Sequence, residues 1–116
     1  MDTYDIWCDL APGRRDFDFA EAVHRYLGAL QADGLIAGYR LTRRKLGFGV
    51  AGLGEFHVAI ETTDLAQLDR AFHIVSTRAD PIESLHFAVN SRVVNFQAAL
   101  YRDFPDPQRR TGDERF

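Results

Sequence analysis

Three segments of this chain alternate apolar and polar side chains with a period of two residues, and this alternation constrains the fold more than any other feature. In residues 4–10 the apolar positions are Tyr4, Ile6, Cys8 and Leu10. Residues 36–46 and 55–61 repeat the pattern, and the glycine-rich stretch between them is typical of a hairpin turn. Such alternation indicates strands that bury one face. The sequence therefore predicts a sheet that is covered on one side.

Between these segments, apolar residues recur at the spacing of a helix. Asp18 and Asp64 each begin a capping box ahead of apolar residues that recur every three or four positions, and Gly34 supplies a stop for the first helix. Pro81 occupies the first position of a third, shorter helix. These helices are expected to provide the cover that the sheet needs.

Residues 93–102 fit two patterns. Phe96 and Leu100 belong both to an alternation of period two and to a helical stripe that begins at Val89, and periodicity alone does not decide between them. A helix would extend the preceding one beyond roughly twenty residues with no internal support for that length. A strand would give the sheet its fourth member, so we predict a strand.

The resulting order of elements is βαββ(α)αβ, a ferredoxin-like α+β arrangement with a four-stranded antiparallel sheet. Its first and third strands are expected at the centre of the sheet. The length of 116 residues fits one domain. We assign residues 1–107 to this domain and residues 108–116 to a charged C-terminal tail.

Composition argues against several classes of protein. With 14 Lys and Arg against 17 Asp and Glu, the chain has a net charge of −3 and lacks the basic excess on which nucleic-acid binding depends. A single cysteine, Cys8, excludes an internal disulfide and favours a reducing, cytoplasmic location. No apolar run approaches the roughly 20 residues that span a bilayer, so we expect no membrane partner.

The sheet face turned away from the helices carries large apolar side chains among its charges. Trp7, the only tryptophan, is expected there together with Leu46, Val93 and Tyr101. A monomer rarely exposes such a mixture, so we expect a second copy of the chain to cover this face. The predicted functional unit is a homodimer.

Several runs of the sequence resemble a known group of proteins. LTRRKLGFG from Leu41, GEFHV from Gly54 and LYRDFPDP from Leu100 resemble a small bacterial family of uncharacterised ferredoxin-like proteins. That family belongs among the dimeric α+β barrels, whose sheets pack face to face, and the resemblance covers nearly the whole chain. It implies the fold and the dimer but no reaction, because that superfamily includes cofactor-free oxygenases, haem-degrading enzymes, lyases and proteins without known activity.

His57 and Trp7 are the candidate catalytic residues, since both are expected in the middle of adjacent strands on the outer face. His57 would act as a general base on a bound phenol or enol while Trp7 positions the ring. Arg40 or Arg44 and an acid such as Asp9 or Glu55 would lie nearby. The simpler interpretation, which we favour, makes His57 a hydrogen-bonded interface residue.

A candidate ligand site lies on the other side of the sheet. Alternation turns Arg43 toward the helices, where it would bind a carboxylate at the mouth of an apolar pocket lined by Tyr39, Leu41, Phe56 and Phe72. In the simpler interpretation, which the pattern favours, the Arg43 side chain extends into solvent at the end of the sheet.

The remaining motifs indicate neither a metal site nor a cofactor. Glycines 47, 49 and 52 match the spacing of a dinucleotide-binding fingerprint, but their place between two antiparallel strands argues against that role. His24, His73 and His86 are expected on helix surfaces rather than at a metal. Cys8 is expected as a small buried side chain.

Three functions stay open at this point. The first is a dimer that binds a small amphipathic carboxylate, lipid-like or aromatic, and the nine phenylalanines together with Arg43 favour it. The second is a cofactor-independent monooxygenase-like or related enzyme that acts on a phenolic or polyketide-like substrate. The third is a structural or regulatory dimer without turnover.

Overall fold

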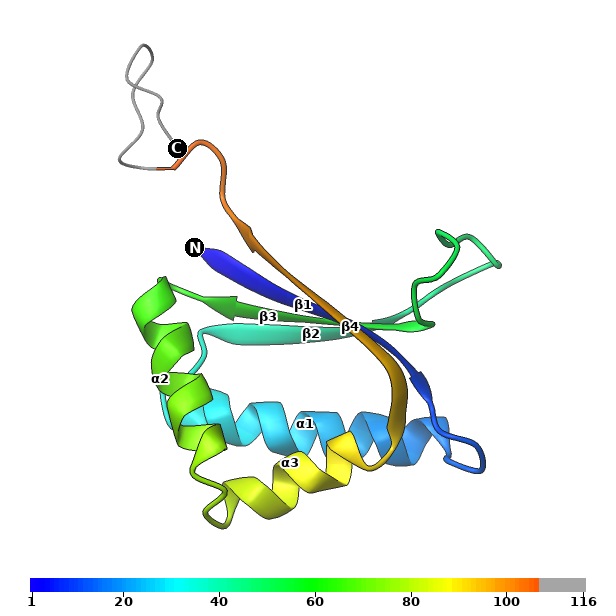
Figure 1. The fold of residues 1–116 in the computed structure, drawn as a ribbon, viewed down its shortest axis with the longest axis horizontal. Helices are drawn as coiled ribbons and strands as arrows, with labels where there is room; N and C mark the ends of the chain where they lie inside the picture. The colour runs from blue at the N-terminus through cyan, green and yellow to red at the C-terminus, as the bar shows by residue number, and fades with distance from the viewer. Residues whose placement is uncertain (107–116) are drawn as a thin grey trace.

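The computed structural model describes residues 1–106, and within them four strands and three helices follow the predicted order (Figure 1). The predicted tail at residues 108–116 lies outside the described residues. The elements are β1 (Asp2–Leu10), α1 (Asp16–Ala32), β2 (Gly38–Arg43), β3 (Phe56–Thr62), α2 (Leu65–Ser76), α3 (Ile82–Asn90) and β4 (Val93–Arg102). Residues 93–102 therefore form a strand, as predicted.

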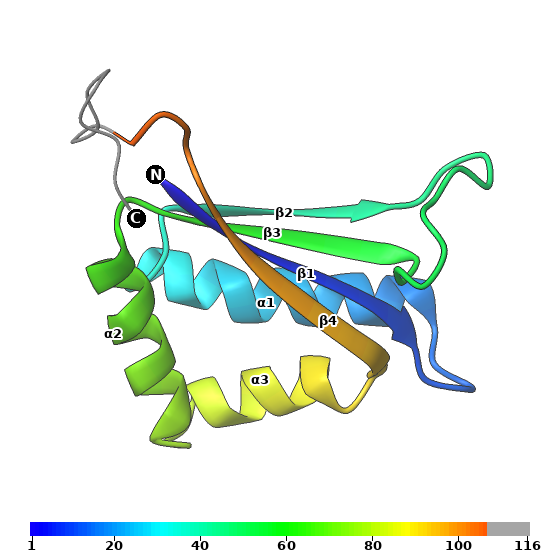
Figure 2. The same ribbon diagram turned by 45° about the horizontal axis from the view of Figure 1, so that its top comes forward.

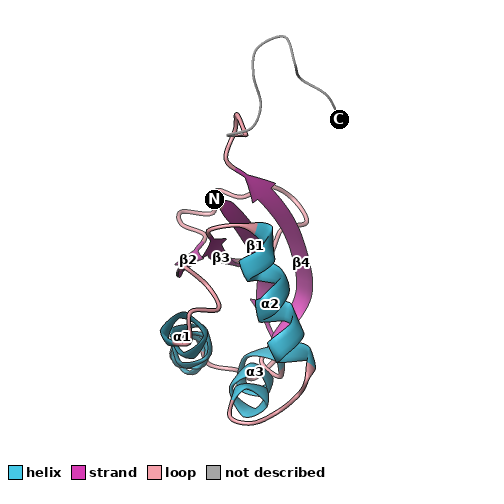
Figure 3. Cartoon of the chain, turned by 90° about the vertical axis from the view of Figure 1, so that its left-hand side faces the viewer, coloured by secondary structure: helices cyan, strands magenta, loops and turns pink. Residues whose placement is uncertain are grey.

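The strands form one antiparallel sheet in the order β2-β3-β1-β4, with β1 and β3 at its centre. All three helices lie on the same side of this sheet (Figures 2 and 3). On that side, which we call the inner face, Ile6 of β1 pairs with Val58 of β3. On the opposite side, which we call the outer face, Trp7 pairs with His57. This arrangement confirms the ferredoxin-like α+β fold.

The helices cover the inner face because each carries an apolar stripe. On α1, Phe19, Val23, Leu27 and Leu30 are buried at helical spacing. The Phe19 ring is completely buried and lies edge-on against Phe56 of β3, with 5.0 Å between ring centroids. In residues 1–106 no helix is long and apolar enough to cross a membrane.

The helix ends agree with the sequence signals in part. The Asp64 carboxylate accepts a 2.8 Å hydrogen bond from the backbone N–H of Gln67, which confirms the predicted cap of α2. Gly34, with φ +73°, follows the end of α1, as predicted. That helix begins at Asp16 instead of Asp18, after Arg15, which forms no side-chain cap. The predicted capping box at Asp18 is therefore wrong.

Residues 44–55 connect β2 to β3 and form no strand-to-helix turn, so they are not a dinucleotide-binding loop. A Cβ atom at Gly54 would lie 2.5 Å from the carbonyl carbon of Cys8, so only glycine lets the chain pass this close to β1. Leu46 is 88% exposed within this loop. Its expected place on the outer face was wrong, because β2 already ends at Arg43.

β4 departs from strict alternation near its start. The register between β1 and β4 shifts between Trp7 and Asp9, and Asn95 has a φ of 56°. Val93 consequently pairs with Leu10 and packs against the core. The prediction that Val93 lies on the outer face was wrong, because this bulge changes the side on which the preceding residues point.

Candidate functional site

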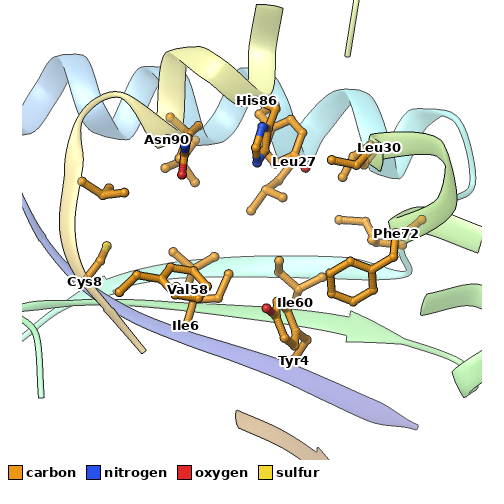
Figure 4. A pocket seen from close by; sticks show the side chains of 18 of the residues that line it. Tyr4, Ile6, Cys8, Leu27, Leu30, Val58, Ile60, Phe72, His86 and Asn90 are labelled. Atoms are coloured by element: carbon orange, nitrogen blue, oxygen red, sulfur yellow. The ribbon is translucent and has the colours of Figure 1, made fainter. Parts of the chain in front are cut away.

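A cavity of about 340 Å³ lies between the inner face of the sheet and the helices (Figure 4). Its volume is within the range of pockets that hold small molecules. The wall is mostly apolar. Its apolar part consists of Ile6, Cys8, Phe19, Val23, Leu27, Leu30, Ile36, Val58, Ile60, Leu68, Ala71, Phe72, Val75, Val89, Val93 and Phe96. We call this space the inner cavity.

Four further side chains bring polar groups into the wall: Tyr4 from β1, Tyr26 from α1, and His86 and Asn90 from α3. Figure 4 shows His86 and Asn90 on the helix side and Tyr4 on the sheet side. Within residues 1–106, none of these four side chains forms a hydrogen bond with another protein group. Their polar atoms are accessible rather than sealed in the core, so they are available to bind the polar atoms of a small molecule.

The inner cavity opens to solvent between α2, α3 and β4. Three of its wall residues mark the opening: the Phe72 and Phe96 side chains are 50% and 55% exposed, and Asn90 is also exposed. The Tyr4 ring lies edge-on against Phe72, with 5.3 Å between centroids. A molecule that enters here meets the Phe72 and Phe96 rings and the Asn90 amide first.

Burial keeps the acidic groups of the wall protonated at neutral pH. Burial, and then the negative charges of Glu83 and ionised Tyr4, raise the pKa of Tyr26 to about 12. Burial also raises the pKa of Tyr4 and, together with the charge of Asp9, raises that of the Cys8 thiol to about 11. The two tyrosines therefore present neutral O–H donors.

Of the predicted ligand-binding residues, the structure places only Phe72 in the wall of the inner cavity. Tyr39, Leu41 and Phe56 are not part of the wall, and the Tyr39 hydroxyl lies 2.9 Å from Nδ1 of His24.

Arg43 does point toward the helix side, but it lies at the far end of β2, close to the start of α1. Its Nη1 donates to Asp16 over 3.0 Å and its Nη2 to Glu55 over 3.4 Å, while the guanidinium carbon sits 5.1 Å above the Phe56 ring. Arg43 is therefore not at the mouth of the inner cavity. Alternation predicts the face of the sheet toward which the Arg43 side chain points. The start of α1 determines that this side chain contacts Asp16.

The predicted catalytic pair is brought together but lies outside the inner cavity. The Trp7 and His57 rings stack with 4.9 Å between centroids and 12° between planes. His57 Nε2 is 2.7 Å from Asp5 Oδ1, and the Asp5 side chain is only 11% exposed. Both rings are on the outer face, so neither reaches a molecule held among the helices.

Sequence reasoning did not place His86 in the cavity wall, because this residue was expected on a helix surface. A signal was present, because Ile82, His86 and Val89 are spaced i, i+4, i+7 and all face inward. Residues 1–106 contain no cluster of three His, Cys, Asp or Glu side chains that would hold a metal ion.

The model of a protein family of unknown function, DUF6614, matches residues 1–116. The chain belongs to this family. No curated protein sequence matches the chain.

Solved structures share the fold across most of their length. SnoaB, a cofactor-independent oxygenase from Streptomyces nogalater, has a TM-score of 0.66 at 13% identity, and the match covers 93% of this chain and 97% of that one. At3g17210 from Arabidopsis thaliana has a TM-score of 0.70 at 6% identity, with 91% and 98% covered. A dimeric ferredoxin-like protein of unknown function from Thermobifida fusca has a TM-score of 0.58 at 14% identity, with 86% and 88% covered. At these identities the likeness supports the fold alone.

Proposed function

We propose that the protein binds a small, largely aromatic molecule with neutral oxygen groups in the inner cavity. One observation carries the proposal: Tyr4, Tyr26, His86 and Asn90 surround an otherwise apolar space and have no hydrogen-bond partner within residues 1–106. Hydroxyl and amide groups bind ketone, phenol and alcohol oxygens. An apolar wall with a few convergent polar groups is the usual form of such a site.

Charge favours a neutral ligand over the carboxylate expected from the sequence. Among residues 1–106 the wall includes neither lysine nor arginine, and Arg43 is already paired with Asp16 and Glu55. A carboxylate would lose hydration on entering without gaining a permanent cation. A neutral ligand avoids this cost, so we rank the amphipathic carboxylate second.

We also propose that two copies of the chain associate through their outer faces. Trp7 and His57 form an aromatic surface at the centre of that face, and Tyr101, on the same face of β4, is 59% exposed. Closed twofold pairing is the commonest way to cover such a surface, and the Thermobifida fusca protein of similar fold is a dimer. The opening of the inner cavity is on the helix side, so pairing leaves it accessible.

Calorimetry and thermal unfolding test the binding proposal with four probes: 1-tetralone, 1-naphthol, 1-naphthoic acid and decanoic acid. A neutral probe at about 100 times its Kd should stabilise the fold by about 2.7 kcal/mol, and both acids should bind more weakly than the two neutral probes. Tighter binding of the acids would restore the carboxylate proposal. No binding of any probe would contradict a ligand site and favour a structural or regulatory dimer.

Light scattering tests the dimer. The unchanged chain should have twice the mass of 13.2 kDa, and Trp7→Glu should yield monomers. A monomeric unchanged chain would refute the association.

A second candidate function, cofactor-independent oxygenation, has the support of the fold shared with SnoaB. Because His57 lies outside the inner cavity, groups of the cavity wall would have to perform the chemistry. Oxygen consumption with 1-naphthol as substrate tests it, and no uptake above the rate without protein would contradict it.

A further inference from the structure

One side chain in the wall of the inner cavity differs chemically from all the others. Histidine is the side chain that ordinarily gains and loses a proton near neutral pH, and His86 is the only one in the wall. The wall residues that the structure describes include no carboxylate, and the two tyrosines and the cysteine among them stay protonated, with the pKa of Tyr26 raised to about 12 and that of Cys8 to about 11. Among these residues, His86 is therefore the candidate proton acceptor.

The neighbour of His86 is a suitable partner for acid–base chemistry. The Tyr26 ring lies 5.4 Å from the His86 ring, centroid to centroid, with 63° between the planes. The two residues come from different helices, α1 and α3, which pack against each other along the helix side of the cavity (Figure 4). A proton acceptor and an O–H donor thus lie next to each other on the helix side of an apolar space.

We propose that His86 acts as a general base that removes a proton from the carbon next to the carbonyl group of a bound aromatic ketone, while the Tyr26 hydroxyl donates a hydrogen bond to the carbonyl oxygen. This inference rests on the proposed ligand site and adds a reaction to it. The substrate class is an enolisable aryl ketone or 1,3-dicarbonyl compound.

The reaction balances without any co-reactant. The C–H bond breaks, a proton joins the free imidazole nitrogen, and the electron pair left on carbon moves into the enolate, so the negative charge resides on oxygen. The imidazolium then returns a proton to carbon or to oxygen. The net results are exchange of the carbon-bound hydrogen with solvent and interconversion of keto and enol forms.

The surroundings favour the charged intermediate. A hydrogen bond from Tyr26 to an enolate oxygen in a mostly apolar cavity is stronger than the same bond in solvent. The titratable groups near His86 are Tyr26 on α1, Glu83 one turn earlier on α3, and Tyr4 and Cys8 on β1, while α2 contributes only apolar side chains to the wall.

Hydrogen–deuterium exchange tests the proposal. The unchanged protein is incubated in deuterated buffer with 1-tetralone, phenylacetone or benzoylacetone, and proton NMR follows the loss of the signal from the carbon next to the carbonyl. Calorimetry measures binding of the same ketones. His86→Gln keeps a side chain that can form hydrogen bonds but cannot take up the proton, and Tyr26→Phe removes the O–H donor. His73→Gln, on the exposed surface of α2, is the matched control.

We expect His86→Gln to slow the protein-dependent exchange by about 100-fold or more while the Kd changes by less than about threefold. Tyr26→Phe should slow exchange by about tenfold or more, and His73→Gln should change neither quantity. Binding with exchange that is equally fast in His86→Gln, or absent from the unchanged protein, would overturn the base while the ligand site stands. No binding of any ketone would overturn both.

Discussion

The two faces of the sheet treat their polar groups in opposite ways. On the outer face His57 is bonded to Asp5 and stacked on Trp7, and Asp9 accepts hydrogen bonds from Asn95 and the backbone of Glu55. On the inner face, Tyr4, Tyr26, His86 and Asn90 surround the cavity without protein partners in residues 1–106. The first set forms hydrogen bonds within the fold, and the second set is available to bind a ligand.

Polar side chains that stabilise the fold therefore lie on one face of the sheet, and polar side chains without protein partners lie around the cavity on the other face. The sequence offered Trp7 and His57 as a catalytic pair because both were expected in the middle of adjacent strands, although it favoured a hydrogen-bonded, non-catalytic His57. In the structure His57 lies 2.7 Å from Asp5, in agreement with the favoured interpretation of a hydrogen-bonded side chain. The predictions below test whether the two faces differ as described.

The largest effect on ligand affinity is expected from filling the inner cavity. Ala71 of α2 is buried in its wall, so Ala71→Leu would occupy space that a ligand needs. Calorimetry with whichever neutral probe binds should show a loss of affinity of at least about tenfold, which is about 1.4 kcal/mol. Ala66→Leu, on the exposed side of the same helix, should leave the affinity unchanged. Equal affinities in the two variants would place the ligand elsewhere.

Removing a paired group from the outer face should cost stability. Asp5→Ala deletes the 2.7 Å contact with His57 from a side chain that is 11% exposed, so we expect the free energy of unfolding to fall by about 2 kcal/mol. Urea titration at a fixed protein concentration measures the change. Glu61→Ala, at an exposed position on the same face, should change it by less than about 0.5 kcal/mol. If both variants unfold at the same urea concentration, the His57–Asp5 contact has no structural role.

Removing an unpaired group from the inner face should cost little. The Tyr26 hydroxyl has no protein partner within residues 1–106 and is not a buried unpaired group, so Tyr26→Phe should leave the stability of the ligand-free protein unchanged. Tyr39→Phe deletes a hydroxyl that is bonded to His24, and it should lose about 0.5 kcal/mol. A clear destabilisation by Tyr26→Phe in urea unfolding would show that its hydroxyl already has a partner.

The smallest effect concerns acid. Hydrogen bonds from the Asn95 side chain and the Glu55 backbone lower the pKa of Asp9. A lowered pKa contributes stability that is complete above the unfolded value of about 3.9 and disappears as the pH falls through the folded value. Asp9→Asn should therefore lose less stability than the unchanged chain between about pH 4 and pH 2. Parallel loss in both proteins, measured by thermal unfolding across this range, would contradict the role of Asp9.

Periodicity was sufficient for the fold. Alternation in β1 and β3 and the cap at Asp64 predicted the element order, the central strands and the pairing of Trp7 with His57. It failed at Val93, because a bulge at Asn95 is a local backbone event that leaves the hydrophobic pattern nearly unchanged.

The candidate site was predicted less well, for a different physical reason. Arg43 was assigned to the correct side of the sheet but meets Asp16, since the start of α1 decides its partners. His86 was expected on a helix surface, although it belongs to an apolar helical stripe whose residues face the sheet. Whether an inward polar group is satisfied depends on three-dimensional neighbours, which no spacing rule supplies.

Cys8 gives this protein a built-in chemical probe. It is the only cysteine in the chain, it lies in the wall of the inner cavity, and it is 2% exposed with its pKa raised to about 11. Alkylation by iodoacetamide should therefore be slow at neutral pH and yield a single labelled site. The rate reports how readily the reagent enters, and any bound molecule should slow it. A labelling time course followed by mass spectrometry thus allows compounds to be screened for occupancy of the inner cavity.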